Sequence, residues 1–261
     1  MTRVKVCGIT TLDDARLCVD AGADALGFIF VENTPRFVTP ALVAPIVRQL
    51  PPFVTPVGVF WDHPAGHVKA VAEACGLRAL QFHGDEKPED LEGFALPVIK
   101  TIKMMSELAG SRADARPLGP PIAATDPADA ALRYGRVATA ILLDSAARWS
   151  EGEGRDPIEW TLAAAMVRHF AARPVLPRVI LSAGLTPETV ARAISVVKPY
   201  GVDVNSGVEA TPGRKDPDKV RRFIAAARSA ARGRRLPRRA SCPTHSATSD
   251  ATAGATCPRR S

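Results

Sequence analysis

The sequence predicts an α/β protein whose parallel strands close into a barrel. Short β-branched runs alternate with amphipathic helical stretches, which is typical of βα units around a parallel sheet. Eight such strand runs occur, and eight strands with eight helices favour a closed barrel over an open sheet. The length of 261 residues also suits one barrel, since ~200 to 250 residues is normal for that architecture. We therefore predict a single TIM (β/α)8 barrel over residues 1–231.

The strands are expected where short apolar, β-branched runs stand between turn-forming residues. In chain order, the predicted strands are Arg3 to Cys7, Ala25 to Phe30, Pro56 to Trp61, Ala79 to Phe82, Val98 to Ile102, Ala140 to Asp144, Arg178 to Ser182 and Gly201 to Val204.

Helix starts are marked by capping residues and by proline at the first helical position. These signals are Thr11 with Asp14 three residues on, Thr39 before Pro40, and Asp216 before Pro217. The last helix places apolar residues at helical spacing, namely Val220, Phe223, Ile224 and Ala227. The proline-rich segment from Met104 to Val137 should hold an irregular loop and one helix, from Pro127 to Tyr134.

The formal charge of +7 is concentrated at the end of the chain. Residues 232–261 carry seven Arg and one Asp, so residues 1–231 are nearly neutral. This segment lacks apolar periodicity, and we predict a disordered basic C-terminal tail. Its arginines could touch RNA or acidic lipid, but no aromatic residues stand among them to stack on bases. A solvated extension is the simpler reading, and we do not expect a nucleic-acid partner.

The cysteines argue against a disulfide framework and a zinc site. There are five, an odd number, with no CxxC spacing and no paired histidines. The chain shows no apolar run of about 18 residues and no charged start followed by an apolar stretch, as a secretion signal would have. We expect a cytoplasmic protein without a membrane span or a bound metal.

Two strand ends carry side chains suited to proton transfer. In barrels of this kind the reactive groups sit at the C-terminal ends of strands, where the sequence places Cys7 and Asp144. Each has a structural alternative: a free cysteine is often a small core residue, and an aspartate can cap the following loop. A redox role for Cys7 would need a nearby resolving cysteine, and none is close in sequence.

Anion-binding groups follow other strands. Arg36 stands in the short loop after the second predicted strand, where its fork of donors suits a carboxylate or phosphate. Small turns follow the last two strands, with Ser182, Ala183 and Gly184 in one and Asn205, Ser206 and Gly207 in the other. Loops seven and eight of a barrel commonly bind phosphate through backbone N–H groups, although a glycine at such a turn can be purely geometric.

The chain resembles a known family at several positions along its length. The segments VKVCGIT, GADALGFIFVENTPRFV, LQFHGDE, ILLDS, LSAGLTPETV and YGVDVNSGVEATPGRKDPDKVRRFI, in this order, closely resemble the phosphoribosylanthranilate isomerases of tryptophan biosynthesis. The resemblance covers residues 3–230. It implies an Amadori rearrangement of N-(5-phosphoribosyl)anthranilate to 1-(2-carboxyphenylamino)-1-deoxyribulose 5-phosphate, without cofactor or metal.

The resemblance also implies roles for individual residues. Asp144 would be the general acid and Cys7 the general base, while Arg36 would bind the anthranilate carboxylate. Gly184, Ser206 and Gly207 would bind the phosphate of the small-molecule substrate. Asp203 is included with the substrate-binding residues, and the oligomeric state is left as monomer or homodimer.

Strand alternation adds a structural hypothesis. Lys5 shares the inward face with Cys7, and the last strand adjoins the first in a closed barrel, so we predict a buried ion pair between Lys5 and Asp203 beneath the thiol. His83 is left outside the catalytic set, because a strand-end histidine is often structural.

Two features depart from the family pattern. Glu151 and Glu153 stand in the loop after Asp144, and Ala183 replaces the first of two usual glycines.

Two alternatives remain open. A related histidine-pathway isomerase has an aspartate where this chain has Cys7. A non-catalytic ligand- or RNA-binding barrel would instead depend on the basic tail.

Overall fold

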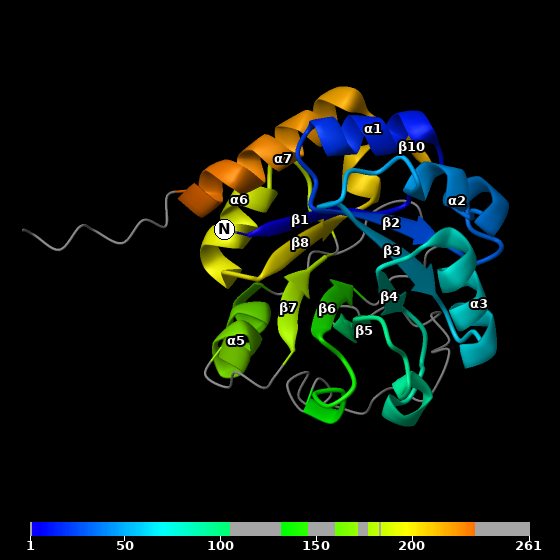
Figure 1. Ribbon diagram of the computed structural model, residues 1–261. Helices are drawn as coiled ribbons and strands as arrows, with labels where there is room; N and C mark the ends of the chain where they lie inside the picture. The colour runs from blue at the N-terminus through cyan, green and yellow to red at the C-terminus, as the bar shows by residue number, and fades with distance from the viewer. Residues whose placement is uncertain (1, 105–131, 146–159, 172–176, 183, 233–261) are drawn as a thin grey trace, which may run out of the picture.

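The computed structural model describes residues 2–104, 132–145, 160–171, 177–182 and 184–232. Eight parallel strands form a closed barrel in which β1 pairs with both β2 and β8, and helices surround the ring (Figure 1). The strands are β1 (Arg3–Val6), β2 (Ala25–Ile29), β3 (Thr55–Phe60), β4 (Ala79–Phe82), β5 (Val98–Met104), β6 (Ala140–Ser145), β7 (Arg178–Leu181) and β8 (Gly201–Val204). The barrel prediction is therefore confirmed, and the observed strand ends lie close to the predicted ones.

The helices are α1 (Leu12–Asp20), α2 (Pro40–Val47), α3 (Ala65–Cys75), α5 (Trp160–Ala171), α6 (Val190–Val197) and α7 (Pro217–Arg232). The predicted starts of α1, α2 and α7 are confirmed. The Thr11 hydroxyl accepts a hydrogen bond from the Asp14 N–H at 3.1 Å, as a helix cap does. The carboxylate of Asp216 likewise accepts from the N–H groups of Asp218 and Lys219. All four predicted core positions of α7 are buried.

The sequence predicts an α-helix after each strand, and this prediction is wrong after β4. Residues 83–97 hold only the 3-10 helix η1 (Pro88–Leu91) between β4 and β5. Pro88 suits the first position of this short helix. Gly93, two residues after its end, has a left-handed φ of 73°, so the chain turns back before a full α-helix can form. Of the predicted helix from Pro127 to Tyr134, Leu132 and Arg133 are helical and the residues before them lie outside the described ranges. The tail predicted from residue 232 lies outside them beyond Arg232.

A short hairpin follows β8 and reaches back over the end of the barrel. The 3-10 helix η3 (Ser206–Val208) leads into β9 (Glu209–Thr211), which pairs antiparallel with β10 (Arg214–Lys215). The hairpin then enters α7. It therefore places charged side chains next to the C-terminal ends of β1 and β8.

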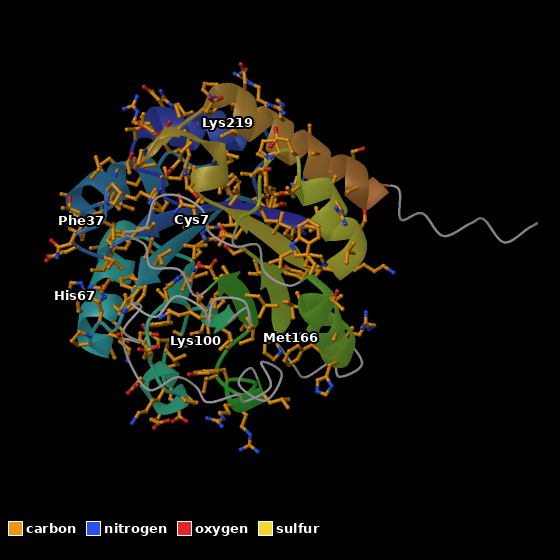
Figure 2. The ribbon with its side chains drawn as sticks, turned by 180° about the vertical axis from the view of Figure 1, so that it is seen from behind. Cys7, Phe37, His67, Lys100, Met166 and Lys219 are labelled. Atoms are coloured by element: carbon orange, nitrogen blue, oxygen red, sulfur yellow. The ribbon has the colours of Figure 1, made fainter. Side chains whose placement is uncertain are left out.

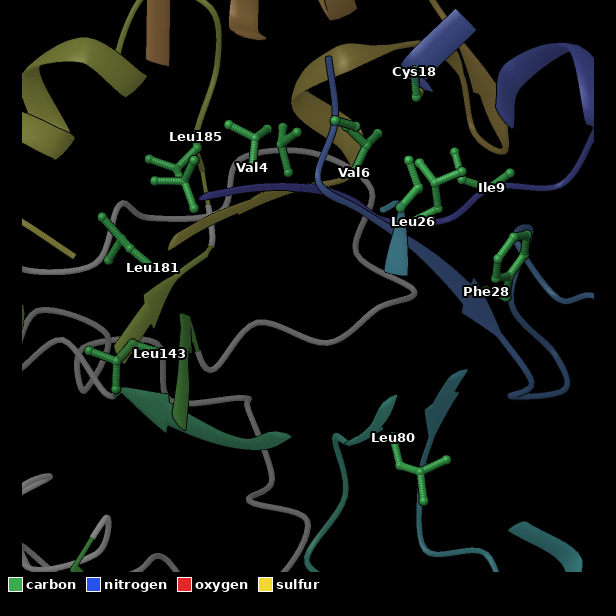
Figure 3. Packing of buried hydrophobic residues seen from close by; sticks show 14 of the residues in the cluster. Val4, Val6, Ile9, Cys18, Leu26, Phe28, Leu80, Leu143, Leu181 and Leu185 are labelled. Atoms are coloured by element: carbon green, nitrogen blue, oxygen red, sulfur yellow. The ribbon is translucent and has the colours of Figure 1, made fainter. Parts of the chain in front are cut away.

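The core has an outer and an inner layer. The outer layer packs strand residues such as Leu26 and Leu181 against the helices (Figure 3). The inner layer fills the barrel, with Val57, Ile99 and Leu142 among its members. Burying each such side chain contributes ~1.5 to 3 kcal/mol before chain entropy is subtracted. Within the described residues, no helix is long and apolar enough to cross a membrane.

Candidate active site

Cys7 follows β1 directly and faces the barrel interior. Its N–H donates to the Val204 carbonyl at 2.8 Å, which extends the pairing of β1 with β8 by one residue. The side chain is 5% exposed and packs with Ile29 and Val59. Figure 2 shows Cys7 at the β1 side of the strand ring and Lys100 at the β5 side. The thiol thus lies at the end of the barrel where such enzymes hold their reactive groups.

Gly27 of β2 provides the space for this thiol. A Cβ at Gly27 would stand 2.6 Å from Cys7 Sγ and 3.1 Å from Lys5 Nζ, so no other residue fits without displacing one of them. This role of Gly27 was not predicted from the sequence. Its signal is a glycine inside a strand, which often marks a close approach of another group.

The predicted ion pair between Lys5 and Asp203 is confirmed. Lys5 Nζ donates to Asp203 Oδ1 at 2.9 Å, and both side chains are 6% exposed. The two residues are directly paired in the register of β1 and β8. Asp203 therefore lies one layer below the thiol and is engaged by Lys5, while a contact of Asp203 with substrate stays a prediction.

The charges around Cys7 have opposing effects on its pKa. Burial raises the pKa of the thiol above its ordinary value and Asp203 adds to this, while Lys5 and Lys215 lower it in part. For Lys5, burial alone would lower the pKa, but Asp203 and Cys7 outweigh it and raise the pKa above the usual value. Lys5 therefore remains a cation beside a thiol that is mostly protonated at rest.

Arg36 is buried and held by a partner that the sequence analysis missed. Its Nε and Nη2 donate to the two carboxylate oxygens of Glu209, at 2.8 and 2.6 Å. Lys215 Nζ binds Glu209 Oε1 at 3.1 Å. Burial alone would raise the pKa of Glu209, but Arg36 and Lys215 hold it below the ordinary value. One edge of the guanidinium is thus fixed, and Nη1 is the nitrogen that Glu209 leaves for another anion.

Asp144 stands on β6, opposite Lys103 of β5 in the strand register. Asp144 is 4% exposed, and Oδ2 of its carboxyl group lies 3.4 Å from His83 Nε2. His83, which the sequence analysis left outside the catalytic set, is therefore in contact with the predicted acid. The alternation of side chains along a strand does not predict this contact, because His83 follows β4, Asp144 lies on β6, and β5 stands between these strands.

The two predicted phosphate turns are brought together. Gly184 adopts a left-handed φ of 62°, and Ser206 is exposed at the start of η3. A Cβ at Gly207 would overlap the Leu185 carbonyl, so glycine lets the loops after β7 and β8 pack against each other. Among the described residues, no backbone carbonyl accepts from the N–H groups of Gly184, Ser206 or Gly207. Both departures from the family pattern, at Ala183 and in the loop after Asp144, lie outside the described ranges.

All seven predicted site residues belong to one end of the barrel. Because the strands are parallel, their C-terminal ends share a face, and each site residue stands on the C-terminal half of a strand or just after it. These residues are Cys7, Arg36, Asp144, Gly184, Asp203, Ser206 and Gly207. A thiol beside a cation, a buried carboxyl group, a fixed guanidinium and two small turns can together transfer protons within a bound anion.

Known proteins with similar sequences share one description. The family model for N-(5'phosphoribosyl)anthranilate (PRA) isomerase matches residues 4–119 and 120–226. The N-(5'-phosphoribosyl)anthranilate isomerase of Pelobacter propionicus is 42% identical over 228 residues, which cover 87% of this chain and 96% of the relative.

Solved structures agree with this result. A phosphoribosyl anthranilate isomerase in complex with reduced 1-(o-carboxyphenylamino)-1-deoxyribulose 5-phosphate has 36% identity and a TM-score of 0.69, covering 88% of this chain and 100% of the other. A structure of monomers generated from the dimeric isomerase of Thermotoga maritima has 34% identity, a TM-score of 0.69 and the same coverage. The chain therefore belongs to the family of N-(5'-phosphoribosyl)anthranilate isomerases.

Proposed function

We propose that the chain converts N-(5'-phosphoribosyl)anthranilate to 1-(2-carboxyphenylamino)-1-deoxyribulose 5-phosphate by an Amadori rearrangement, as a step of tryptophan biosynthesis. One observation carries the assignment of its residues. The buried thiol of Cys7 lies above the Lys5–Asp203 ion pair at the same end of the barrel as Asp144 and Arg36. This end therefore offers an acid and a base around an anion-binding centre.

Asp144 acts first, as the general acid. Its proton goes to the furanose ring oxygen, the bond from that oxygen to C1′ breaks, and the nitrogen lone pair forms a protonated Schiff base. Asp144 is 4% exposed, so little solvent can compete with the substrate for its proton. A positioned acid of this kind typically contributes ~10²- to 10⁴-fold to the rate.

Cys7 acts second, as the general base. Its thiolate takes the C2′ proton, the C–H electrons form the C1′=C2′ double bond, and the positive charge on nitrogen is neutralised. The resulting enolamine then tautomerises to the ketone product. Lys5 supports this step, because its ammonium group lowers the pKa that burial has raised and so makes the thiolate accessible.

Arg36 and the phosphate turns hold the two ends of the substrate. Glu209 fixes the guanidinium along one edge and leaves the Nη1 side for the anthranilate carboxylate. The loops containing Gly184, Ser206 and Gly207 present backbone N–H groups to the phosphate. Asp203 is best placed to act through Lys5 rather than by touching the substrate.

The test follows the loss of substrate fluorescence with purified protein. Wild type should turn over, while Cys7→Ser and Asp144→Asn should each lose at least ~100-fold in kcat, as expected on removing a positioned base or acid. Cys75→Ser, a buried cysteine on α3, and Asp20→Asn, at the exposed end of α1, are the matched controls. Near-normal rates in both active-site variants, with native circular dichroism, would show that the acid and base are wrongly assigned.

The alternative of a non-catalytic barrel has its own test. A variant ending at Arg232 should keep full isomerase activity, because the site lies within the barrel. Loss of activity together with loss of RNA binding in that variant would favour a function of the basic segment instead. Inactivity of the full chain on this substrate, with turnover of the related histidine-pathway substrate, would favour that rival isomerase.

We also propose that the protein is a homodimer. Phe53, in the loop between α2 and β3, is 94% exposed, which is unusual for a large aromatic residue. It stands at the rim of a cavity of about 530 Å³ at the N-terminal end of the barrel, opposite the active-site end. A two-fold axis would place Phe53 of each copy in the cavity of the other and bury both apolar surfaces.

The proposed compartment is the cytoplasm. The three described cysteines are free and buried, which fits a reducing environment.

A further inference from the structure

His83 is a buried titratable group to which the steps above give no role. It follows β4 directly, with its N–H donating to the Phe60 carbonyl at 2.8 Å, and it is 6% exposed. Its ring Nε2 lies 3.4 Å from Oδ2 of Asp144, long for a hydrogen bond but within the range that tightens when substrate binds. The contact crosses the inward face of β5, since β4 and β6 are not neighbours.

The other ring nitrogen of His83, Nδ1, faces the amide nitrogen of Gln81, which can only donate. Gln81 Nε2 lies 3.4 Å from His83 Nδ1, and Thr101 Oγ1 lies 3.3 Å from it. Gln81 Nε2 also donates to Thr101 Oγ1 at 3.3 Å. An amide nitrogen carries no lone pair to offer, so this contact requires Nδ1 to be the acceptor. In a neutral ring the proton then stands on Nε2.

The orientation of the Gln81 amide supports this tautomer. Its Oε1 is buried and has no hydrogen-bond partner among the described residues. Rotating the amide by 180° would turn the oxygen toward Nδ1, but it would leave an NH₂ group with two donors in the place of one unpartnered acceptor. Burying two unpartnered donors costs more than burying one unpartnered acceptor.

The imidazole is also held in its plane. Trp61, at the end of β3, stacks on it with ring centroids 5.4 Å apart and planes 29° from parallel. Lys103 Nζ lies 4.2 Å from the centroid of Trp61, and 3.7 Å from Asp85 Oδ1. Lys103 therefore lies against the indole, while the buried Lys100 donates to the carbonyl of Gly84, the residue after His83, at 2.7 Å and to Glu86.

We propose that His83 is a positioning residue for the general acid: fixed as the Nε2–H tautomer by Gln81, it donates to Oδ2 of Asp144 and so holds the carboxyl group in one orientation. This inference rests on the proposed function. The histidine neither gains nor loses a proton in the reaction. After Asp144 has protonated the ring oxygen, the Nε2–H group remains bonded to the carboxylate and stabilises its charge.

Steady-state kinetics of three variants test the positioning. In His83→Ala, kcat should fall ~10- to 100-fold with KM changed less than ~3-fold, because an orienting partner is lost and substrate contacts are kept. His83→Gln can place an amide donor near the former Nε2 and should recover most of kcat. His83→Asn places its amide nearer the former Nδ1 and should not. Equal kcat in the Gln and Asn variants, or a rise in KM alone, would overturn the proposal.

A double-mutant cycle separates positioning from a general structural role. In the Asp144→Asn background, His83→Ala should lower the residual rate by less than about 2-fold, because the histidine acts through Asp144. A loss as large as in the wild-type background would overturn the proposal.

Nitrogen NMR of the full chain with isotopically labelled histidine provides a readout that needs no activity. The His83 signals, assigned by their disappearance in His83→Gln, should show a protonated Nε2 and an unprotonated Nδ1 at neutral pH. Gln81→Met should mix the two tautomers and lower kcat less than His83→Ala does. A wild-type Nδ1–H tautomer or an imidazolium would overturn the proposal. Absence of turnover by wild type with the expected tautomer present would instead count against the proposed function.

Discussion

Lys5 Nζ donates to Asp203 Oδ1 at 2.9 Å immediately below the thiol of Cys7, and all three groups are buried. The three form one electrostatic unit, in which Lys5 lowers the pKa of the thiol and Asp203 raises it. A buried pair of opposite charges is costly to desolvate and is weak as a source of stability. Its position next to the thiol that we propose as the base favours a role in the chemistry.

Opposite shifts in the pKa of Cys7 should follow from removing either member of this pair. Lys5→Met removes the cation, so the thiol pKa should rise, the thiolate fraction at neutral pH should fall, and kcat should reach its plateau at higher pH. Asp203→Asn removes the anion and should lower the thiol pKa. Each unit of change alters the thiolate fraction about tenfold below the pKa.

The measurement is the pH dependence of alkylation of Cys7 by iodoacetamide, read by mass spectrometry alongside kcat. The exposed Lys69→Met is the matched control for loss of a positive charge. Shifts in the same direction for Lys5→Met and Asp203→Asn would contradict the electrostatic account.

The sequence predicts the barrel and this ion pair for the same physical reason. Side chains alternate along a strand with period two, and closure of the barrel makes the last strand a neighbour of the first. The residue positions alone therefore place Lys5 and Asp203 on the inward face of adjacent strands. This alternation does not predict the contact of His83 with Asp144, because the contact crosses an intervening strand. Nor does it predict that Glu209 holds Arg36, since 173 residues separate them and the hairpin geometry decides their approach.

The size of residue 27 should limit both activity and stability. Gly27→Ala would place a methyl group 2.6 Å from Cys7 Sγ, so either the thiol or β2 must move. We expect at least ~100-fold loss in kcat/KM, since a displacement of ~1 Å at a reacting group costs about that much. Thermal unfolding should also begin at a lower temperature.

Gly66→Ala on α3 is the control for Gly27→Ala, because a Cβ there meets no atom within 4 Å. This control should be neutral or slightly stabilising, by up to ~1 kcal/mol, as a glycine is replaced in a helix. Full activity in Gly27→Ala would show that the thiol tolerates displacement and would weaken its assignment as the base.

Arg36→Lys should raise KM far more than it lowers kcat. A lysine cannot bind Glu209 along one edge and a substrate carboxylate with another nitrogen at the same time. We expect ~10-fold or more in KM, measured by steady-state fluorescence, in line with the loss of one hydrogen bond to a charged group at 1.5 to 3 kcal/mol. Arg16→Lys, on α1, is the control. If Arg36→Lys left KM unchanged, the carboxylate would have to bind elsewhere.

Acid should destabilise the protein partly through Glu209. Its folded-state pKa is held below the ordinary value of about 4.3 by Arg36 and Lys215, against the opposing effect of burial. This carboxylate therefore stabilises the fold fully above the unfolded-state pKa, and the contribution is lost as pH falls through the folded-state pKa. Urea unfolding of Glu209→Gln should give a lower stability at neutral pH and a flatter decline below about pH 4.3. An unchanged acid slope, relative to the exposed control Glu73→Gln, would contradict this role.

Phe53→Glu should convert the proposed dimer to a monomer without abolishing catalysis. The substitution would remove an aromatic ring from each facing cavity, whose lining is mostly apolar, and would put in its place a charged group that must lose its water. Sedimentation equilibrium at micromolar concentrations should give twice the chain mass for wild type and one chain mass for the variant. Leu42→Glu, on the outer face of α2 and 45% exposed, should remain dimeric. Because the cavity lies at the end of the barrel opposite Cys7, kcat of the monomer should stay within about 3-fold of wild type, as for a change that leaves the reacting geometry intact. A monomeric wild type, or equal dissociation of the Leu42 control, would rule out Phe53 as the anchor of the interface.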